Sequence, residues 1–344
     1  MEAVFMLRML FSLSGAAVFS LTFICNTVFA DPDAPHQPAS WAPYPKNLSQ
    51  FDYSGEKLQQ HWPELTKATF IEFPSAENLR KEALQYPKLM AYSREQAQQR
   101  DAHPALQAVA EDNFEPLATA VQHIWRLHFQ GDFEQAYQLG KKLGPAGLIP
   151  ALYSRLIYTT LIEKDDAKRL TAYREISYRS NQLLPLAPDH AFSLFGLAYA
   201  HARELELMST SAAASTDYLS QTQDILERLQ QRYPQRALYP AMLGGLHAGV
   251  VERVGSIIGT MTYGSSESGA LKAFSRALAL ESGVPVILNE YAAALTRMDA
   301  SDFAKDISRA LTRCIQLPVF SAEEALNRQA CQNKLSQLIA SDSL

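Results

Sequence analysis

Apolar residues recur at three- and four-residue spacing through most of the chain after Phe114, and this spacing predicts α-helices. Leu117, Val121 and Ile124 share one helical face, and Gly131-Asp132 interrupts the pattern before the next helix. Further helices are predicted in pairs with short breaks: 148–162 with 166–184, 190–208 with 217–233, 237–253 with 269–281, 285–298 with 302–316, and a last helix over 321–340. Because no run of alternating residues predicts a set of strands, the fold class is all-α.

The chain before this helical pattern divides into two regions. Residues 1–30 hold an apolar stretch that ends at Val28-Phe29-Ala30, which is typical of a signal peptide cleaved after Ala30. Translation from Met6 in place of Met1 would remove Glu2 from the leader, and an uncleaved membrane anchor is the alternative to cleavage. We therefore expect a periplasmic or secreted protein with no membrane span after cleavage.

Residues 31–115 are predicted to form an irregular and short-helix N-terminal region. The first part, to about residue 54, is rich in proline, asparagine and aromatic residues and has no period. The remainder gives short helical pieces, which prolines interrupt repeatedly. Ser75 is a candidate N-cap for one of these pieces, since its hydroxyl can accept a hydrogen bond from a free backbone N–H. Residues 116–341 are predicted to form a domain of degenerate helical repeats.

Small and aromatic residues recur within the helix pairs at positions that suggest a repeat. Ala270-Leu-Lys-Ala-Phe274-Ser-Arg-Ala277 places an aromatic residue between two small ones at helical spacing, and Gly131-Asp132-Phe133 followed by Ala136 matches its opening. The pattern resembles tetratricopeptide repeats over about residues 117–317, which implies a helix-turn-helix superhelical array. Gly140 and Asp306 depart from the repeat, and an ordinary helical bundle is the alternative.

One stretch resembles a narrower family. The segments Gly255-Ser-Ile-Ile-Gly259-Thr-Met-Thr-Tyr263-Gly264, Gly269-Ala-Leu-Lys-Ala-Phe274 and Asn289-Glu290-Tyr291-Ala292 are similar to the T-component of tripartite periplasmic transporters. The resemblance covers about residues 190–317. It implies a helical repeat protein that assists a substrate-binding partner, although the lipid anchor of typical members is missing.

Charge and cysteine content narrow the choice of partners. The formal net charge of -5 disfavours a nucleic-acid partner, which would require a basic stripe. Cys314 and Cys331 are the cysteines that remain after cleavage, and an oxidising compartment favours a disulfide between them. The two residues are not level on neighbouring helices unless the second helix begins late or crosses the first, so two buried free thiols are the alternative.

The sequence shows no recognised catalytic or metal-binding motif, and we expect no cofactor, no metal and no enzyme activity. His123 and His128 are five residues apart, which separates them on a helix and makes them poor co-ligands. Gly264 and Gly269 have the spacing of a phosphate-binding loop, but Ala270-Leu271 stands where that motif requires Lys and Ser or Thr.

Glycines are concentrated in one apolar helical segment. They lie at positions 244, 245, 249, 255, 259 and 264. Each glycine inside a helix costs up to about 1 kcal/mol relative to alanine, so the concentration requires a reason. Either two helices pack closely there, or a ligand or partner binds there. In the second case the candidate site residues are Glu252, Arg253, Gly255, Gly259 and Tyr263.

The sequence therefore favours an exported helical-repeat binding or scaffold protein that acts through protein–protein contacts. Its expected partner is another exported or membrane protein, such as the substrate-binding subunit of a transporter. The alternatives are an exported hydrolase with no visible motif and a small-molecule carrier. A pocket lined by Glu252, Arg253 and Tyr263 would favour the carrier, whereas a bare concave groove would favour the scaffold.

Overall fold

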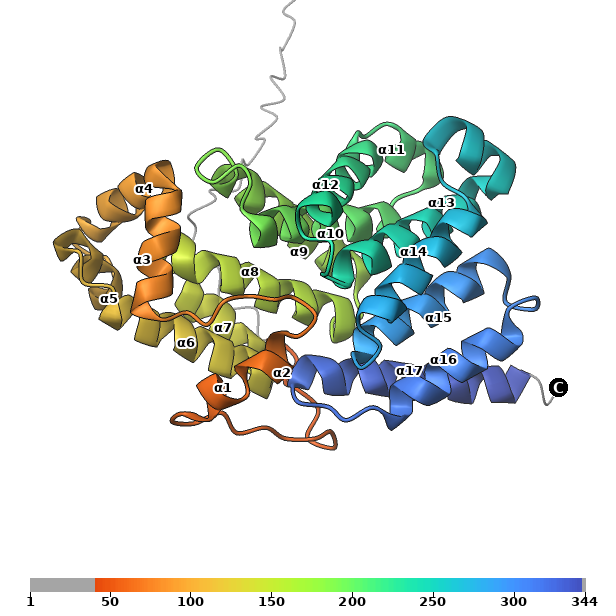
Figure 1. Ribbon diagram of the computed structural model, residues 1–344, viewed down its shortest axis with the longest axis horizontal. Helices are drawn as coiled ribbons and strands as arrows, with labels where there is room; N and C mark the ends of the chain where they lie inside the picture. Colours follow the sequence, from red (N-terminus) through yellow and green to blue (C-terminus); the bar gives the residue numbers. More distant parts are fainter. Residues whose placement is uncertain (1–40, 342–344) are drawn as a thin grey trace, which may run out of the picture. The chain divides into compact units, whose positions relative to one another are not determined.

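The computed structural model describes residues 41–341, so the predicted signal peptide lies outside the described residues. The described chain forms seventeen α-helices, one 3-10 helix and no strand (Figure 1). Their bounds are α1 Lys57–Gln60, α2 Trp62–Thr66, α3 Ala76–Gln85, α4 Pro87–Ala97, α5 Pro104–Gln107, η1 Ala108–Glu111, α6 Glu115–Gln130, α7 Phe133–Gly140, α8 Gly144–Leu161, α9 Asp166–Leu183, α10 Ala191–Leu207, α11 Thr210–Ala214, α12 Tyr218–Arg232, α13 Leu238–Tyr263, α14 Glu267–Leu280, α15 Pro285–Asp299, α16 Ala304–Gln316 and α17 Ala322–Ser341. None of these helices is both long and apolar enough to span a bilayer.

The long helices follow the predicted segments closely, which confirms the all-α class. The predicted break at Gly131-Asp132 ends α6, and Gly131 adopts a φ of 96° that residues with a side chain rarely adopt. A Cβ at Gly131 would also lie 2.6 Å from the ring of Tyr44. The glycine therefore both ends the helix and lets the N-terminal segment approach it.

Consecutive helices pack against each other through most of the chain. The helices of each pair α7 and α8, α9 and α10, α13 and α14, and α15 and α16 are in contact, and α10 also contacts α12. Gly140 explains one departure from the repeat pattern, because a Cβ there would lie 2.4 Å from the backbone oxygen of Gly147. An aromatic residue at position 140 would force α7 and α8 apart.

Two elements differ from the predicted pattern. The predicted break between 208 and 217 contains a short additional helix, α11. The helix predicted over 237–253 continues as α13 to Tyr263, with a kink at Gly255, where φ is 78° and ψ is 163°. Both additions border a hollow that is described in the next subsection.

The irregular N-terminal segment packs on the same core as the first long helices. Trp41 stacks on Tyr158 at a ring-centroid distance of 4.3 Å, and the backbone N–H of Ala42 donates to the Tyr158 hydroxyl at 3.0 Å. Trp62 packs edge-on against Trp125 of α6. These aromatic contacts attach the N-terminal segment to α6 and α8.

A disulfide joins Cys314 of α16 to Cys331 of α17, with a Cα–Cα distance of 6.3 Å. The structure thus confirms the predicted bridge. The two residues come level because residues 317–321 carry the chain beyond the end of α16 before α17 begins and returns past it (Figure 1).

The start of α17 also contacts α6 and α8, far from it in the sequence. The Tyr153 hydroxyl donates a hydrogen bond to the Glu323 carboxylate and lies 3.0 Å from each of its oxygens. Glu323 also lies 3.5 Å from the Nε2 atom of His128. In an open solenoid each repeat contacts only its neighbours. This helix therefore ties distant parts of the array together.

Glu324, the residue after Glu323, makes the stability of the fold depend on pH. Its side chain is buried, accepts the backbone N–H of Phe320 at 2.7 Å and lies 3.7 Å from the Lys67 ammonium. Burial raises the pKa of Glu324 from 4.5 to about 7, against the lowering effects of the Phe320 hydrogen bond and Lys67. Between about pH 4.5 and 7 the Glu324 carboxyl is therefore protonated in the folded protein but ionised in the unfolded chain. The free energy of unfolding falls as the pH rises through this range.

We expect Glu324→Gln to remove this loss, because glutamine does not ionise. The free energy of unfolding of the variant minus that of the wild type should therefore rise by up to about 3 kcal/mol from pH 5 to pH 8. Urea unfolding at both pH values measures the difference, with the exposed Glu227→Gln as the control. A difference that does not change with pH would contradict the buried, proton-binding state of Glu324.

Candidate functional site

A hollow with a volume of about 540 Å³ lies between α10, α11, α12, α13 and α15. Ligand pockets typically hold about 300–1,000 Å³. The next two hollows hold about 20 and 30 Å³, which is room for one or two water molecules. Only the first of these three has the size of an organic ligand, and we refer to it below as the cavity.

Most of the cavity surface is apolar. The apolar wall consists of Phe195, Leu205, Leu219, Leu238, Ala241, Met242, Leu246, Val250, Val254, Val286 and Ile287. These side chains come from four helices that are separated in the sequence. Water in such a space makes few hydrogen bonds, so an apolar molecule would displace it at a gain in free energy.

The glycines of α13 serve two different purposes. A Cβ at Gly244 would lie 2.6 Å from the Phe274 ring, so this glycine permits the close packing of α13 on α14. Gly245 and Gly249 instead line the cavity, and a Cβ at either would meet no atom within 4 Å. Helix packing therefore explains Gly244 but not Gly245 or Gly249, which leave bare backbone facing the hollow.

The structure brings three of the five predicted site residues together. Glu252, Arg253 and Tyr263 line the cavity, whereas Gly255 and Gly259 are not among its lining residues. Gly255 forms the kink of α13, and a Cβ at Gly259 would lie 2.8 Å from the backbone oxygen of Ser265. Those two glycines shape the backbone around the cavity, which brings Tyr263 back to its edge.

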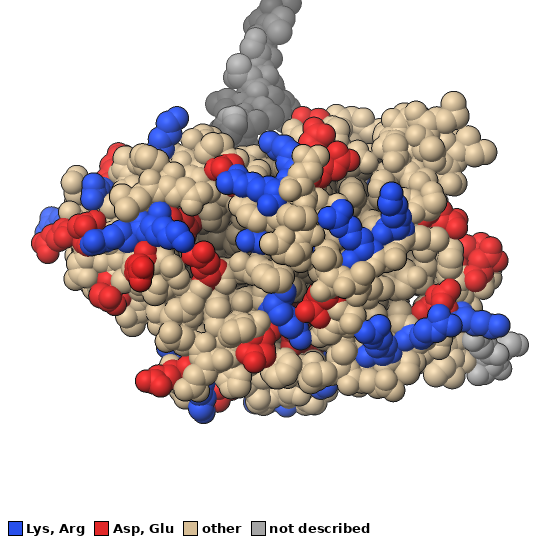
Figure 2. All heavy atoms as spheres, viewed as in Figure 1, with Lys and Arg blue, Asp and Glu red and all other residues tan. Residues whose placement is uncertain are grey.

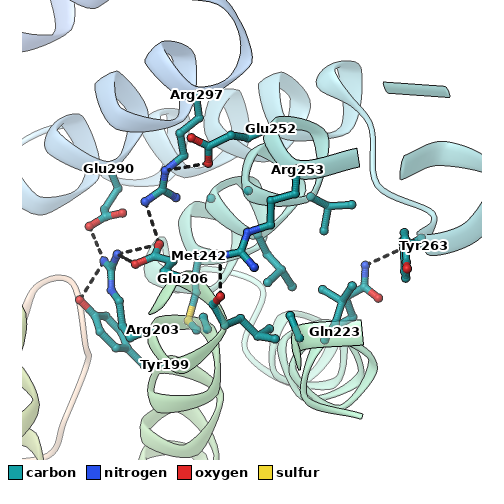
Figure 3. Close-up of a pocket in the computed structure, with 18 of the residues that line it drawn as sticks. Tyr199, Arg203, Glu206, Gln223, Met242, Glu252, Arg253, Tyr263, Glu290 and Arg297 are labelled. Atoms are coloured by element: carbon teal, nitrogen blue, oxygen red, sulfur yellow. Dashed lines mark hydrogen bonds and ion pairs between the residues drawn. The ribbon is translucent and has the colours of Figure 1, made fainter. Parts of the chain in front are cut away.

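A network of charged side chains forms one end of the cavity (Figure 3). Arg203 of α10 donates to Glu206 at 2.9 Å, to the Tyr199 hydroxyl at 3.1 Å and to Glu290 of α15 at 2.5 Å. Arg297 of α15 donates to Glu206 at 2.8 Å. The network therefore connects α10 to α15 by two ion pairs.

The network holds Glu206 in its charged form. Burial would raise the pKa of this carboxyl, but the guanidinium groups of Arg203 and Arg297 outweigh it and lower the pKa to about 2. Glu252 lies at the edge of the network, 3.8 Å from Arg297, and its side chain is about half exposed. At neutral pH the paired residues thus form a fixed, nearly neutral wall.

Arg253 differs from the other two arginines of the cavity. In the part of the chain that the structure describes, its guanidinium forms one hydrogen bond, to the backbone oxygen of Leu205 at 2.5 Å, and no ion pair. Figure 3 shows its side chain extending from α13 into the group of lining residues. Nearby, Gln223 of α12 donates to the backbone oxygen of Tyr263 at 3.1 Å, which fixes the end of α13.

The paired charges of the cavity were not predicted from the sequence. Arg203 and Glu206 are three residues apart on the largely apolar α10, and Glu290 and Arg297 are seven residues apart on α15. Both spacings place the charges on one helical face. Pairs of charged residues on the apolar face of a helix were therefore the sequence feature that could have indicated these site residues. No local sequence pattern shows that the two pairs contact each other.

A buried chain of polar side chains resembles a serine hydrolase triad in composition. The Ser154 hydroxyl lies 3.0 Å from Nδ1 of His128, whose Nε2 lies 3.5 Å from Glu323. Ser154 and His128 have no exposed surface, and Ser154 also donates to the backbone oxygen of Pro150 at 2.9 Å. Because no substrate carbonyl can reach this hydroxyl, the contacts serve packing between α6, α8 and α17. Within residues 41–341, no group of three His, Cys, Asp or Glu side chains is arranged to hold a metal ion.

Comparison of the chain with known proteins finds no matching family model, curated protein or solved structure. The geometry of the cavity is therefore what points to a function. That geometry combines an apolar wall, bare backbone at two glycines, a paired charge network and one arginine that has no acidic partner among residues 41–341.

Proposed function

We propose that the protein is an exported helical-repeat binding protein that carries a small, largely apolar molecule in the cavity. The open space at Gly245 and Gly249 is the observation that supports this proposal most strongly. Two helical glycines cost up to about 2 kcal/mol relative to alanine, and no packed neighbour explains that cost. A ligand lying against the bare backbone does explain it.

The proposal takes up the resemblances seen in the sequence. We propose a tetratricopeptide-like superhelical array, which the paired contacts of consecutive helices support, and a role as an accessory to a periplasmic transporter. In that role the cavity would hold a molecule for a substrate-binding subunit. Catalysis is not part of the proposal, because no histidine or cysteine lines the cavity to activate a nucleophile.

We expect Gly249→Leu to weaken ligand binding, because its side chain would occupy part of the cavity. The side chain would enter open space, and leucine is a better helix former than glycine, so the variant should fold with unchanged or higher stability. Its affinity for the neutral apolar dye Nile red should fall by roughly tenfold or more. Dye fluorescence and urea unfolding measure the two quantities.

Gly196→Ala is the matched control for this experiment. Gly196 lies in α10, has open space at its Cβ position and does not line the cavity. The control should gain helix stability without changing dye affinity. A folded Gly249→Leu variant that binds the dye as the wild type does would refute the cavity as the binding site.

A second candidate function, docking to another exported protein, is favoured by an apolar surface beside the cavity. Ile257, Ile258 and Met261 share one face of the helical stretch after the kink and are 77%, 54% and 84% exposed. They belong to what we call the charge-free lobe, residues 208–216 and 254–266, which contains no Lys, Arg, Asp or Glu. Figure 2 shows this lobe at the upper right, without charged side chains. Exposed apolar patches of this kind mark interaction sites.

A photo-crosslinking amino acid in place of Met261 tests this docking function in the native cell. We expect a covalent adduct with one exported or membrane protein, and loss of that adduct when Ile257→Lys is added. The same crosslinker at Tyr178, which is 64% exposed on α9, should not give the adduct. Identical adducts from both positions would show that the charge-free lobe is not a specific docking surface.

A further inference from the structure

The three arginines that line the cavity differ in the number of partners that they have. Three arginines and three glutamates line it, so their formal charges cancel. Arg203 and Arg297 are both paired with glutamates of the network. Within the described residues, Arg253 has only the backbone oxygen of Leu205 as a partner, although a guanidinium carries five N–H donors. Arg253 therefore has most of its donors left for a ligand.

We propose that the ligand of the cavity is a singly charged carboxylate with an apolar body, and that Arg253 binds its carboxylate. This inference rests on the proposed function of the cavity. A carboxylate offers two oxygens at the spacing of two guanidinium N–H groups, and such charge-assisted bonds are stronger than neutral ones. The apolar wall and the backbone at Gly245 and Gly249 receive the rest of the molecule.

The neighbouring glutamates limit the charge that the cavity accepts. Glu206 and Glu290 are engaged by Arg203, so neither carboxylate is free to attract a cation. Apart from Arg253, the cavity is lined by two arginines and three glutamates, so a second negative charge on the ligand would find no free cation there. Glu252 is the least strongly paired acid, at 3.8 Å from Arg297, and it provides the competing site for an amine.

A purely structural role for Arg253 makes a different prediction. As a cap on the last turn of α10, Arg253 would stabilise that helix through the Leu205 oxygen and would have no effect on the choice of ligand. The two roles are separated by comparing ligands that differ only in their head group. Folding stability alone does not separate them.

The experiment measures displacement of Nile red from the wild-type protein at neutral pH by dodecanoate, dodecanol and dodecylammonium. We expect dodecanoate to bind roughly tenfold or more tightly than the other two, because only its head group can pair with Arg253. Raising the salt concentration should reduce this preference, since added ions screen the pair.

Variants of Arg253 then assign the preference to this side chain. Arg253→Gln should lower the affinity for dodecanoate by roughly tenfold or more and leave that for dodecanol within about twofold. Arg253→Lys should retain part of the preference, because it keeps the charge but loses the paired donors. Arg309→Gln, at an arginine of α16 with 75% side-chain exposure, should change neither affinity.

The outcomes distinguish this inference from the proposed function. If all three ligands displace the dye equally, or if dodecylammonium binds best, the cavity binds apolar molecules but the carboxylate assignment is wrong. If Arg253→Gln keeps the preference for dodecanoate, another group recognises the head. If the wild type binds neither the dye nor any of the three ligands, the proposed function itself fails and the inference falls with it.

Discussion

The ion pairs that join α10 to α15 connect two of the helices around the cavity, and they form its polar end. Arg203 and Arg297 share Glu206, and Arg203 also holds Glu290 on the opposite helix. Buried ion pairs contribute little net stability because desolvation offsets much of their attraction. Their value here is geometric, since they hold a polar end on a hollow that apolar side chains would otherwise fill.

Helix α13 contributes to the cavity through two glycines, which have no side chain to fill it. Gly245 and Gly249 present backbone to the open space, while Gly244, one residue away, packs against Phe274 of α14. One helix therefore has a tightly packed side and an open side. Beyond the kink at Gly255 the chain continues into the charge-free lobe, so one continuous helical element borders the cavity and carries the exposed apolar residues.

Local sequence predicted the helices well but not the contacts between distant helices. Three- and four-residue spacing located α6 and the later long helices, and Gly131 marked a true helix end. The Ala- and Ser-rich α11 has no apolar period and was missed, and no local pattern shows that α17 reaches α6 and α8. The glycine cluster led to Glu252, Arg253 and Tyr263, whereas the pairing of Arg203 with Glu290 spans 87 residues and is invisible locally.

Native mass spectrometry of the protein, purified from its own cells without detergent or organic solvent, tests the central claim most directly. We expect a species heavier than the polypeptide by the mass of one small organic molecule, which organic solvent releases. A polypeptide that carries no additional mass, even under the gentlest ionisation, would contradict the view that this cavity carries a ligand.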